Sequence, residues 1–231
     1  HPRVRRQRQM CIRDSNNSKI IKNMLQGRNI RKWYYNESEE NLIFTRRGTD
    51  IEKFPFIKKH LYGFYDNLKP KTPEDSTKGR KPGNYKWFEI LDNTAYYREF
   101  EKSEKIIWGL TADKWAYTLD TEQHYLPSNA YILTSETIPI RFILGLLNSK
   151  LLRYYFGFIG VMTAGGAYTL KASTIEALPI AIGTKQQQKE IALKVENILN
   201  AKATNKQTDV SSSEHEIDCL VSVSYTHLRA H

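Results

Sequence analysis

The sequence predicts an α+β protein in which a twisted, mostly antiparallel sheet packs on a long central helix, with a helical tail at the C-terminus. Apolar side chains recur at steps of three and four through residues 138–161, which is the spacing of one helix face. Residues 86–135 instead hold short aromatic and β-branched runs separated by polar breaks, a pattern typical of antiparallel strands. A further periodic stretch after residue 183 predicts the tail.

The predicted central helix is expected to be a core element with a cationic outer edge. Arg141, Lys150 and Arg153 interrupt its apolar run, whereas a membrane span needs about 20 consecutive, mostly apolar residues. The apolar stripe consists of Ile140, Ile143, Leu147, Leu151, Tyr154 and Phe158. The helix leads into a Gly165-Gly166 loop, which we expect to be an ordinary connection, although exposed amides of this kind also suit a phosphate.

The two ends of the chain do not resemble the rest of it. Residues 5–15 back-translate to a DNA string that contains ATGTGTATAAGAGAC, and residues 223–228 back-translate to its reverse complement. An inverted repeat of this kind resembles read-through into a transposon-type sequencing adapter. We therefore expect residues 1–15 and 223–231 to be non-biological, and the sequence between them to be a fragment of a longer protein.

Setting the two ends aside changes the composition of the chain. They contribute +5 of the formal charge of +10, so the remainder is moderately basic. Cys11 belongs to them, which leaves Cys219 as a single cysteine and excludes a disulfide framework, a pattern that suits a reducing cytoplasm. We find no signal peptide or membrane span, and expect no membrane partner. The expected organisation is a recognition domain over residues 16–182 and a helical tail or spacer over residues 183–222.

The first half of the chain offers basic groups beside aromatic ones. Residues 20–35 interleave the two types, which suits phosphate contact and equally suits an ordinary strand edge. Residues 42–47 are a short strand candidate, and residues 54–68 are predicted to be a helix with Pro55 in its first turn. The stripe of that helix is formed by Phe54, Ile57, Leu61, Phe64 and Leu68.

Residues 69–85 are predicted to be an irregular polar loop, because they contain three prolines and two glycines. Within it the cluster 78–81, Lys-Gly-Arg-Lys, suits contact with a duplex backbone, and simply solvated charge is the alternative.

Later residues supply strand candidates and two tail helices. The strand candidates are residues 86–91, 95–100, 104–110, 114–120 and 130–135. Their aromatic content exceeds the needs of a core, so some of these rings are expected at the surface. Thr184 and Gln187 predict a capping box at the start of a tail helix that packs on one neighbour through Ile191, Val195 and Ile198. A last short helix is expected after Ser213.

No catalytic constellation is recognisable in the sequence. It has no Gly-rich cofactor loop and no N-P-P-Y or D-P-P-Y tetrapeptide, and its histidines lack the spacing of metal ligands. Asp113, Asp120 and Glu122 are expected to be turn residues rather than an acid–base pair. We therefore expect this segment to be non-catalytic on its own, with no cofactor and no metal.

The order of motifs resembles a known family. The series is L-Q-G-R-N-I-R-K-W, F-P-F-I-K-K-H-L with N-L-K-P, Y-K-W-F-E-I, F-E-K-S-E-K-I-I-W, L-P-S-N-A-Y-I-L-T, I-L-G-L-L-N-S-K-L-L-R-Y-Y-F, G-G-A-Y-T-L-K, L-P-I and E-H-E-I-D-C-L-V. This series is similar to the TaqI-like C-terminal specificity (target recognition) domain of type II restriction–modification DNA adenine methyltransferases, over nearly all of residues 20–221.

The resemblance implies a sequence-specific partner of double-stranded DNA. It also implies a methyltransferase lobe that precedes the domain in the same parent chain, often with a fused nuclease. That lobe would flip an adenine and methylate it with S-adenosylmethionine, so the cofactor is expected in the parent enzyme and not in this segment. Two alternatives stay open: half of a type I restriction specificity subunit, and a domain that binds protein or carbohydrate instead of DNA.

The resemblance assigns no base contact, so the candidate DNA-binding residues come from side-chain chemistry. Arginine and lysine suit guanine and phosphate, and aromatic rings suit stacking. The first set is Arg46, Arg47, Lys78, Arg80, Lys81, Arg98, Lys105, Trp108 and Lys114. The second set is Lys150, Arg153, Tyr168 and Lys171.

Overall fold

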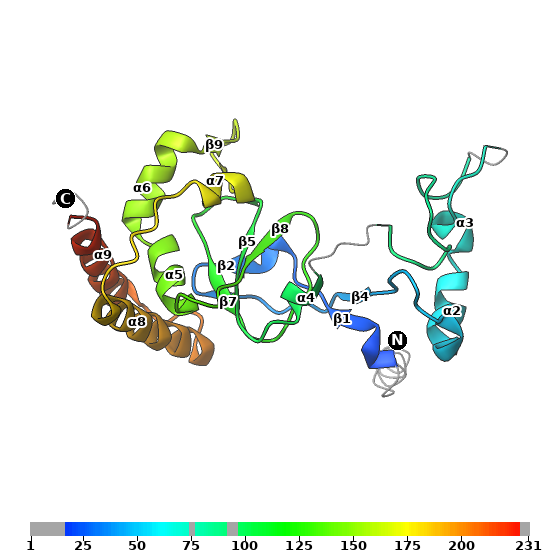
Figure 1. The fold of residues 1–231 in the computed structure, drawn as a ribbon, viewed down its shortest axis with the longest axis horizontal. Coiled ribbons are helices and arrows are strands. Elements are labelled where there is room, and N and C mark those ends of the chain that lie inside the picture. The colour runs from blue at the N-terminus through cyan, green and yellow to red at the C-terminus, as the bar shows by residue number, and fades with distance from the viewer. Residues whose placement is uncertain (1–16, 74–76, 92–96, 227–231) are drawn as a thin grey trace. The chain divides into compact units, whose positions relative to one another are not determined.

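The computed structural model describes residues 17–73, 77–91 and 97–226 and divides into two compact units (Figure 1). The small unit comprises residues 17–23 and 40–97, and the large unit comprises residues 24–39 and 98–226. Helices and short antiparallel strands make up the structure, which confirms the predicted α+β class. Residues 1–15, predicted to be non-biological, lie outside the described residues.

The small unit contains a two-stranded antiparallel sheet and short helices. Its elements are η1 (Asn17–Lys19), β1 (Ile21–Asn23), β4 (Asn41–Ile43), η3 (Ile51–Lys53), α2 (Pro55–Tyr62) and α3 (Tyr65–Leu68). β1 pairs with β4, so the strand predicted over residues 42–47 is shorter and begins earlier. The apolar core of the unit is formed by Ile20, Ile51, Phe54, Ile57 and Phe88.

The helix predicted over residues 54–68 is interrupted. α2 ends at Tyr62 and is followed by Gly63, and Phe64 leaves the helical region, with φ −116° and ψ 17°, before α3 begins. Glycine favours such an interruption because its backbone loses the most conformational freedom in a helix. Phe54 and Ile57 are buried as predicted, but Phe64 is 52% exposed.

Two runs predicted to be strands have other structures. Residues 86–91 form turns, because side chains satisfy their backbone groups. Glu89 accepts a hydrogen bond from the Lys86 amide (2.8 Å), and the Arg47 guanidinium donates to the carbonyls of residues 90 and 91. The described part of the run 95–100 is a helix, α4 (Tyr97–Phe100), and residues 92–96 lie outside the described residues.

The large unit contains most of the regular structure. Its N-terminal elements are η2 (Gly27–Asn29), β2 (Ile30–Arg31) and β3 (Tyr34–Tyr35). Its strands after residue 98 are β5 (Lys105–Gly109), β6 (Thr111–Ala112), β7 (Thr118–Asp120), β8 (Ala130–Leu133), β9 (Val161–Met162) and β10 (Tyr168–Thr169). Its longer helices are α5 (Ile140–Leu147), α6 (Lys150–Ile159), α8 (Lys185–Thr204) and α9 (Ser211–Thr226), and α7 (Ala172–Glu176) is a short one.

The predicted single sheet is divided into small antiparallel sheets. β5 lies between β7 and β8, β10 lies between β6 and β9, and β2 pairs with β3 as a hairpin. The strands predicted within residues 104–110, 114–120 and 130–135 are therefore confirmed as β5, β7 and β8. β5 is buried along its whole length, since it is the central strand of its sheet.

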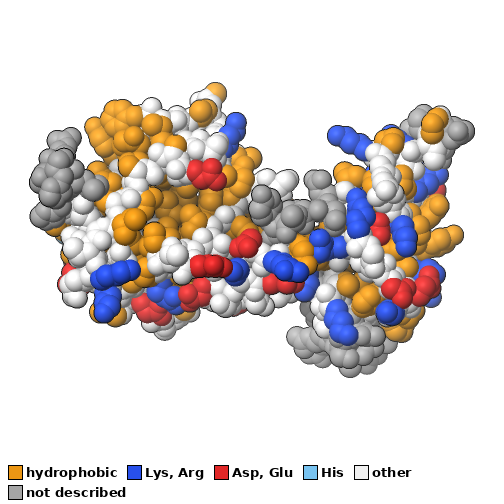
Figure 2. Space-filling model, viewed as in Figure 1, with side chains coloured by type: hydrophobic (Ala, Val, Ile, Leu, Met, Phe, Trp, Pro, Cys, Tyr) orange, Lys and Arg blue, Asp and Glu red, His pale blue; other side chains and the backbone are white. Residues whose placement is uncertain are grey.

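The predicted central helix is in fact two helices that meet at Asn148 and Ser149. Ser149 adopts an extended conformation and its hydroxyl accepts a hydrogen bond from the Leu152 amide, which caps α6. The extended residue shifts the apolar register of the second helix. Leu152 and Phe156 are consequently buried in α6, whereas Tyr154 (68% exposed) and Phe158 (70%) of the predicted stripe face outward. Figure 2 shows hydrophobic side chains at the surface where α6 lies in Figure 1.

The tail helices belong to the core of the large unit. α8 packs against both α5 and α9, and not against a single neighbour as predicted (Figure 1). α8 can lie close to α5 because residue 145 of α5 is a glycine. A Cβ at that position would lie 2.6 Å from Ile191 and 3.0 Å from Val195 of α8. The capping box of Thr184 and Gln187 is present as predicted. Among the described residues, no helix combines the length and apolarity that a membrane span requires.

A buried ion pair lies in the sheet formed by β7, β5 and β8. The Lys105 ammonium is 2.6 Å from an Asp120 oxygen, and both side chains are fully buried. Lys105 also donates to the Phe100 carbonyl (2.9 Å), and His124 Nδ1 lies 2.9 Å from the second Asp120 oxygen. Burial alone would raise the pKa of Asp120, but the contacts with His124 and Lys105 outweigh it and lower that pKa.

We predict that Asp120→Asn lowers the free energy of unfolding by about 3–5 kcal/mol at neutral pH, because it leaves Lys105 buried without a counter-ion. The folded-state pKa of Asp120 is depressed, so its contribution is present above the unfolded pKa and is lost as the pH falls through the folded pKa. Asp120→Asn should therefore also weaken the dependence of stability on acid. Urea unfolding at neutral and acidic pH measures both effects.

Lys102→Gln is the matched control for that substitution. It breaks the exposed ion pair of Lys102 with Glu136 (2.9 Å), and exposed pairs contribute little because water and salt screen them. The urea midpoint of this variant should equal that of the unaltered chain. Equal losses in the two variants would show that the buried pair has no special role.

Candidate nucleic-acid interface

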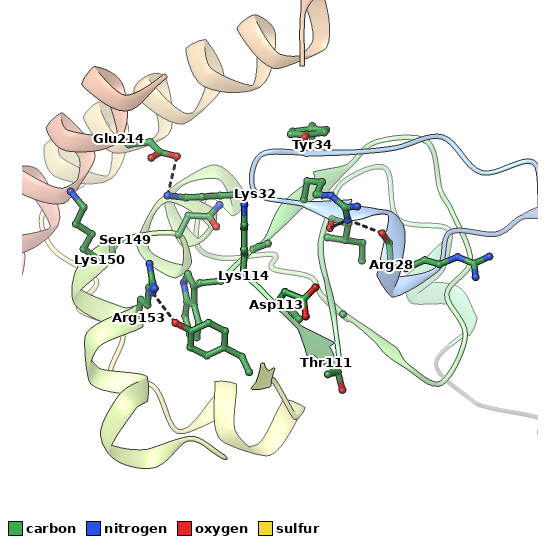
Figure 3. A pocket seen from close by; sticks show the side chains of 18 of the residues that line it. Arg28, Lys32, Tyr34, Thr111, Asp113, Lys114, Ser149, Lys150, Arg153 and Glu214 are labelled. Atoms are coloured by element: carbon green, nitrogen blue, oxygen red, sulfur yellow. Dashed lines mark hydrogen bonds and ion pairs between the residues drawn. The ribbon is translucent and has the colours of Figure 1, made fainter. Parts of the chain in front are cut away.

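A cavity of about 940 Å³ in the large unit is lined by six basic side chains (Figure 3). We call it the basic groove. Its basic residues are Arg28, Arg31, Lys32, Lys114, Lys150 and Arg153. Two acidic residues, Asp113 and Glu214, also line it. Lys32, Lys114, Lys150 and Arg153 lie together on one side of the cavity, and Arg28 lies at the opposite end (Figure 3).

The hairpin of β2 and β3 places Arg31 and Lys32 at the groove. Its turn contains Trp33, which has a positive φ of 73°, an uncommon conformation for a large side chain. Tertiary contacts hold this turn: Trp33 is buried, and its amide donates to the Tyr117 carbonyl (3.1 Å). The Arg31 guanidinium is oriented by its bonds to the carbonyls of Arg28 (2.7 Å) and Ile30 (2.8 Å).

The break between α5 and α6 forms another wall of the groove. Asn148 is buried there, and its side-chain amide pairs with the backbone of Tyr117 on both sides. Its oxygen accepts from the Tyr117 amide (3.1 Å), and its nitrogen donates to the Tyr117 carbonyl (3.0 Å). This pairing resembles the two hydrogen bonds between paired residues of antiparallel strands, and it fixes the start of α6. Lys150 and Arg153, in the first turn of that helix, consequently face the cavity.

Tyr168 holds Arg153 in place from a neighbouring strand. The Tyr168 hydroxyl accepts from Arg153 Nε (2.9 Å), and the guanidinium carbon lies 5.8 Å from the centre of the tyrosine ring. β10 carries Tyr168 and pairs with β6, Tyr168 lying opposite Ala112. This contact does not use the two terminal nitrogens of Arg153. The guanidinium is therefore oriented while its bidentate edge stays available for a ligand.

Acidic residues of the tail helix α9 balance part of this charge. Glu214 lies 2.9 Å from the Lys32 ammonium, and Asp218 lies 3.3 Å from that of Lys150. Asp218 also accepts from the Lys150 amide (2.8 Å), which helps to cap α6. Both lysines therefore already have a carboxylate partner, and an anionic ligand would compete with α9 for them.

The residues of the large unit that were predicted to contact DNA fall into three groups: residues in the groove, exposed residues outside it, and buried residues. Lys114, Lys150, Arg153 and Tyr168 come together in the basic groove. Arg98 and Lys171 are exposed outside its lining, on α4 and at the start of α7. Lys105 and Trp108 are wrong as DNA contacts, because both are buried. Lys105 is held in the ion pair with Asp120, and the Trp108 indole donates to the Leu170 carbonyl (2.9 Å).

The arginines of the small unit are turned into the unit instead of toward solvent. Arg47 donates to the carbonyls of residues 90 and 91, and Arg80 donates to those of Leu68 (2.6 Å) and Trp87 (3.0 Å). Arg46 stacks on the Tyr97 ring, 3.5 Å from its centre. Three predicted contact residues thus have a structural role, whereas Lys78 and Lys81 of the predicted set are exposed.

Three groove residues, Arg28, Arg31 and Lys32, were absent from the predicted set. The interleaving of basic and aromatic residues in 20–35 is the sequence pattern that could have identified them. A strand edge produces the same pattern, so only the hairpin and its position beside Trp115 and Tyr168 distinguish the two interpretations. Within the described residues, no group of three or more His, Cys, Asp or Glu side chains is placed to hold a metal ion.

Comparison with known protein families matches residues 22–180 to the TaqI-like C-terminal specificity domain. The match covers most of the chain, including nearly all of the small unit and the part of the large unit up to α7. No curated protein matches the sequence. The family match supports DNA recognition as the role of the domain.

We predict that Asn148→Ala lowers the free energy of unfolding by about 1–3 kcal/mol, because the buried Tyr117 amide loses its partner while the Tyr117 carbonyl keeps only the Trp33 amide. Urea unfolding followed by tryptophan fluorescence measures the change. Asn200→Ala, at an exposed position of α8, is the control and should cause no loss, since alanine is a better helix former than asparagine. Equal stability of the two variants would show that the pairing with Tyr117 does not hold the helix break.

Proposed function

Because the chain belongs to the TaqI-like C-terminal specificity domain family, we propose that it is the double-stranded DNA recognition module of a type II restriction–modification enzyme. In this proposal it acts with an adenine methyltransferase lobe of the same parent chain in the cytoplasm. S-adenosylmethionine would bind in that lobe, which would also carry out the methyl transfer. The observation that carries the proposal is the basic groove, a single cavity lined by six cations.

The groove offers two kinds of contact that duplex DNA requires. Lys114 and Lys150 are exposed ammonium groups, which suit phosphate oxygens because they act as compact point charges. Arg153 is the candidate base reader, since Tyr168 orients its guanidinium without using the bidentate edge. A guanidinium presented in this way pairs with O6 and N7 of guanine in the major groove.

We predict that the chain binds random-sequence duplex DNA with an affinity that falls steeply with salt, because each neutralised phosphate releases counterions. The double substitution Lys114→Gln with Lys150→Gln should make the slope of log affinity against log salt shallower by about 2. Fluorescence anisotropy between about 50 and about 200 mM salt measures this slope. Salt-independent binding, or none, would favour a protein- or carbohydrate-binding domain instead.

The control for that double substitution is Lys185→Gln with Lys189→Gln. Both lysines are exposed on α8 and lie outside the lining of the groove, so the control removes the same charge elsewhere. It should leave the slope unchanged. Equal effects of the two double variants would mean that the total charge of the chain, and not the groove, governs binding.

We also predict that Glu214→Gln strengthens duplex binding and makes the salt slope steeper by about 1, because it releases Lys32 for a phosphate. A glutamine oxygen can still accept the bond from the Trp33 indole, so the hairpin should stay in place. Glu216→Gln is the matched control, since Glu216 pairs with Lys194 outside the groove. Weaker binding by Glu214→Gln would show that this carboxylate supports the DNA contact and does not compete with it.

A further inference from the structure

Apart from residues 1–15 and 223–231, which carry +5 of the formal charge of +10, the net charge of the chain is concentrated in the small unit. Residues 16–23 and 40–97 contain 13 Lys or Arg and 8 Asp or Glu, which is a formal charge of +5. Residues 24–39 and 98–222 contain 16 of each type and are formally neutral. Figure 2 shows basic side chains spread over the visible face of the small unit. Between residues 16 and 222, the long-range attraction for an anionic partner therefore originates in the small unit.

The basic loop of the small unit is fixed at its base and is not simply irregular. The Arg80 amide donates to the Lys69 carbonyl (2.9 Å), and the Lys71 amide donates to the Arg80 carbonyl (3.0 Å). Gly79 permits this closure, because it has a φ of +117° and a Cβ there would lie 2.5 Å from the Lys69 oxygen. The Arg80 guanidinium packs over the Tyr85 ring at 4.6 Å.

This closure presents two lysines on a defined frame. Lys78 lies near the end of the closed segment, Lys81 follows directly after it, and both are exposed. The backbone carbonyl of Lys81 accepts a hydrogen bond from the Tyr85 hydroxyl. Arg80, between them, donates to two backbone carbonyls. The loop thus displays ammonium groups outward while its arginine holds the fold.

Two tyrosines stand beside Lys78. Tyr62, Tyr65 and Lys78 line one cavity of about 430 Å³. Tyr62 is 63% exposed and Tyr65 is 38% exposed, and their rings pack against Trp87 with centroids 5.8 and 5.4 Å away. The rings are therefore held in position at the surface. Exposed tyrosine hydroxyls and lysines are both common donors to phosphate oxygens in DNA complexes.

We propose that the small unit binds the phosphodiester backbone of duplex DNA without reading its sequence, through Lys78, Lys81, Tyr62 and Tyr65. This inference rests on the proposed function of the chain and assigns a separate task to one part of it. All three arginines of the small unit are turned inward, so this surface lacks the bidentate fork that reads guanine. Lysines contribute affinity and register and carry no base preference.

The test compares Lys78→Gln with Lys81→Gln, made together, against the control pair Lys185→Gln with Lys189→Gln, in the full 231-residue chain. The probe is a fluorescent random-sequence duplex, titrated at several salt concentrations. The loop variant should bind more weakly, with a salt slope shallower by about 2, while the control keeps the slope of the unaltered chain. Selection from a random duplex pool should enrich the same sequences for the loop variant as for the unaltered chain.

A second variant tests the hydroxyl groups alone. Tyr62→Phe with Tyr65→Phe keeps both rings against Trp87 and should weaken binding to all duplexes about tenfold, with the same enriched sequences. Unchanged thermal unfolding midpoints show that both variants are folded.

The outcomes separate this inference from the proposed function. If the unaltered chain binds duplex DNA steeply with salt but the loop variant keeps its slope, the small unit is not the backbone contact and the groove assignment stands. If the loop variant enriches different sequences, Lys78 or Lys81 reads bases, which also overturns the inference. If the unaltered chain does not bind duplex DNA at all, both proposals fail.

Discussion

The pairing of the Asn148 side chain with the backbone of Tyr117 is the contact on which the large unit depends. It joins the end of α5 to the segment that enters β7, and it hydrogen-bonds to both the amide and the carbonyl of Tyr117. The helix must stop there, because Ser149 is extended and restarts it with its own hydroxyl as the cap. One buried amide therefore sets the direction of α6, and with it the positions of Lys150 and Arg153.

Arginine and lysine have different tasks in this chain. The arginines of the small unit donate to backbone carbonyls or stack on rings, and in this way they close segments that have no strand partner. The guanidinium suits this role because it offers several donors in a fixed plane and is weakly hydrated. The lysines at the surface keep their solvated ammonium groups. A count of basic residues consequently overstates the number of groups that a ligand can reach.

The sequence predicted those features that short-range patterns encode. The capping box of Thr184, the buried strand after Lys105 and the apolar face of α8 all follow from spacing within a few residues. The break at Asn148 was not predictable, because apolar residues continue at helical steps on both sides of it. Its cause lies in Tyr117, which is distant in sequence. The burial of Lys105 has the same origin, since its counter-ion Asp120 comes from a neighbouring strand.

The prediction of site residues was limited in the same way, because it could not use contacts between residues that are distant in sequence. Residue chemistry identified four members of the groove but could not separate exposed cations from cations that hold the fold.

The C-terminal residues that were predicted to be non-biological are partly folded. Residues 223–226 continue α9, and the Tyr225 hydroxyl donates to the Pro179 carbonyl. A helix extends readily once formed, because each added residue gains a hydrogen bond. The helical structure of residues 223–226 therefore does not show that they belong to the natural protein. The prediction that they derive from an adapter rests on the inverted repeat in the back-translated termini.

The balance of charge in the large unit bears on specificity. Specificity is the difference between the affinities for the right and the wrong sequence, so a groove that attracts every duplex strongly would discriminate poorly. Glu214 and Asp218 pair with two groove lysines, and the large unit is formally neutral as a whole. A phosphate must displace these carboxylates before it gains the lysine contact. Under the proposed function, binding in the groove would depend more on contacts such as that of Arg153, which require a matching base, and general attraction to DNA would be left to the small unit.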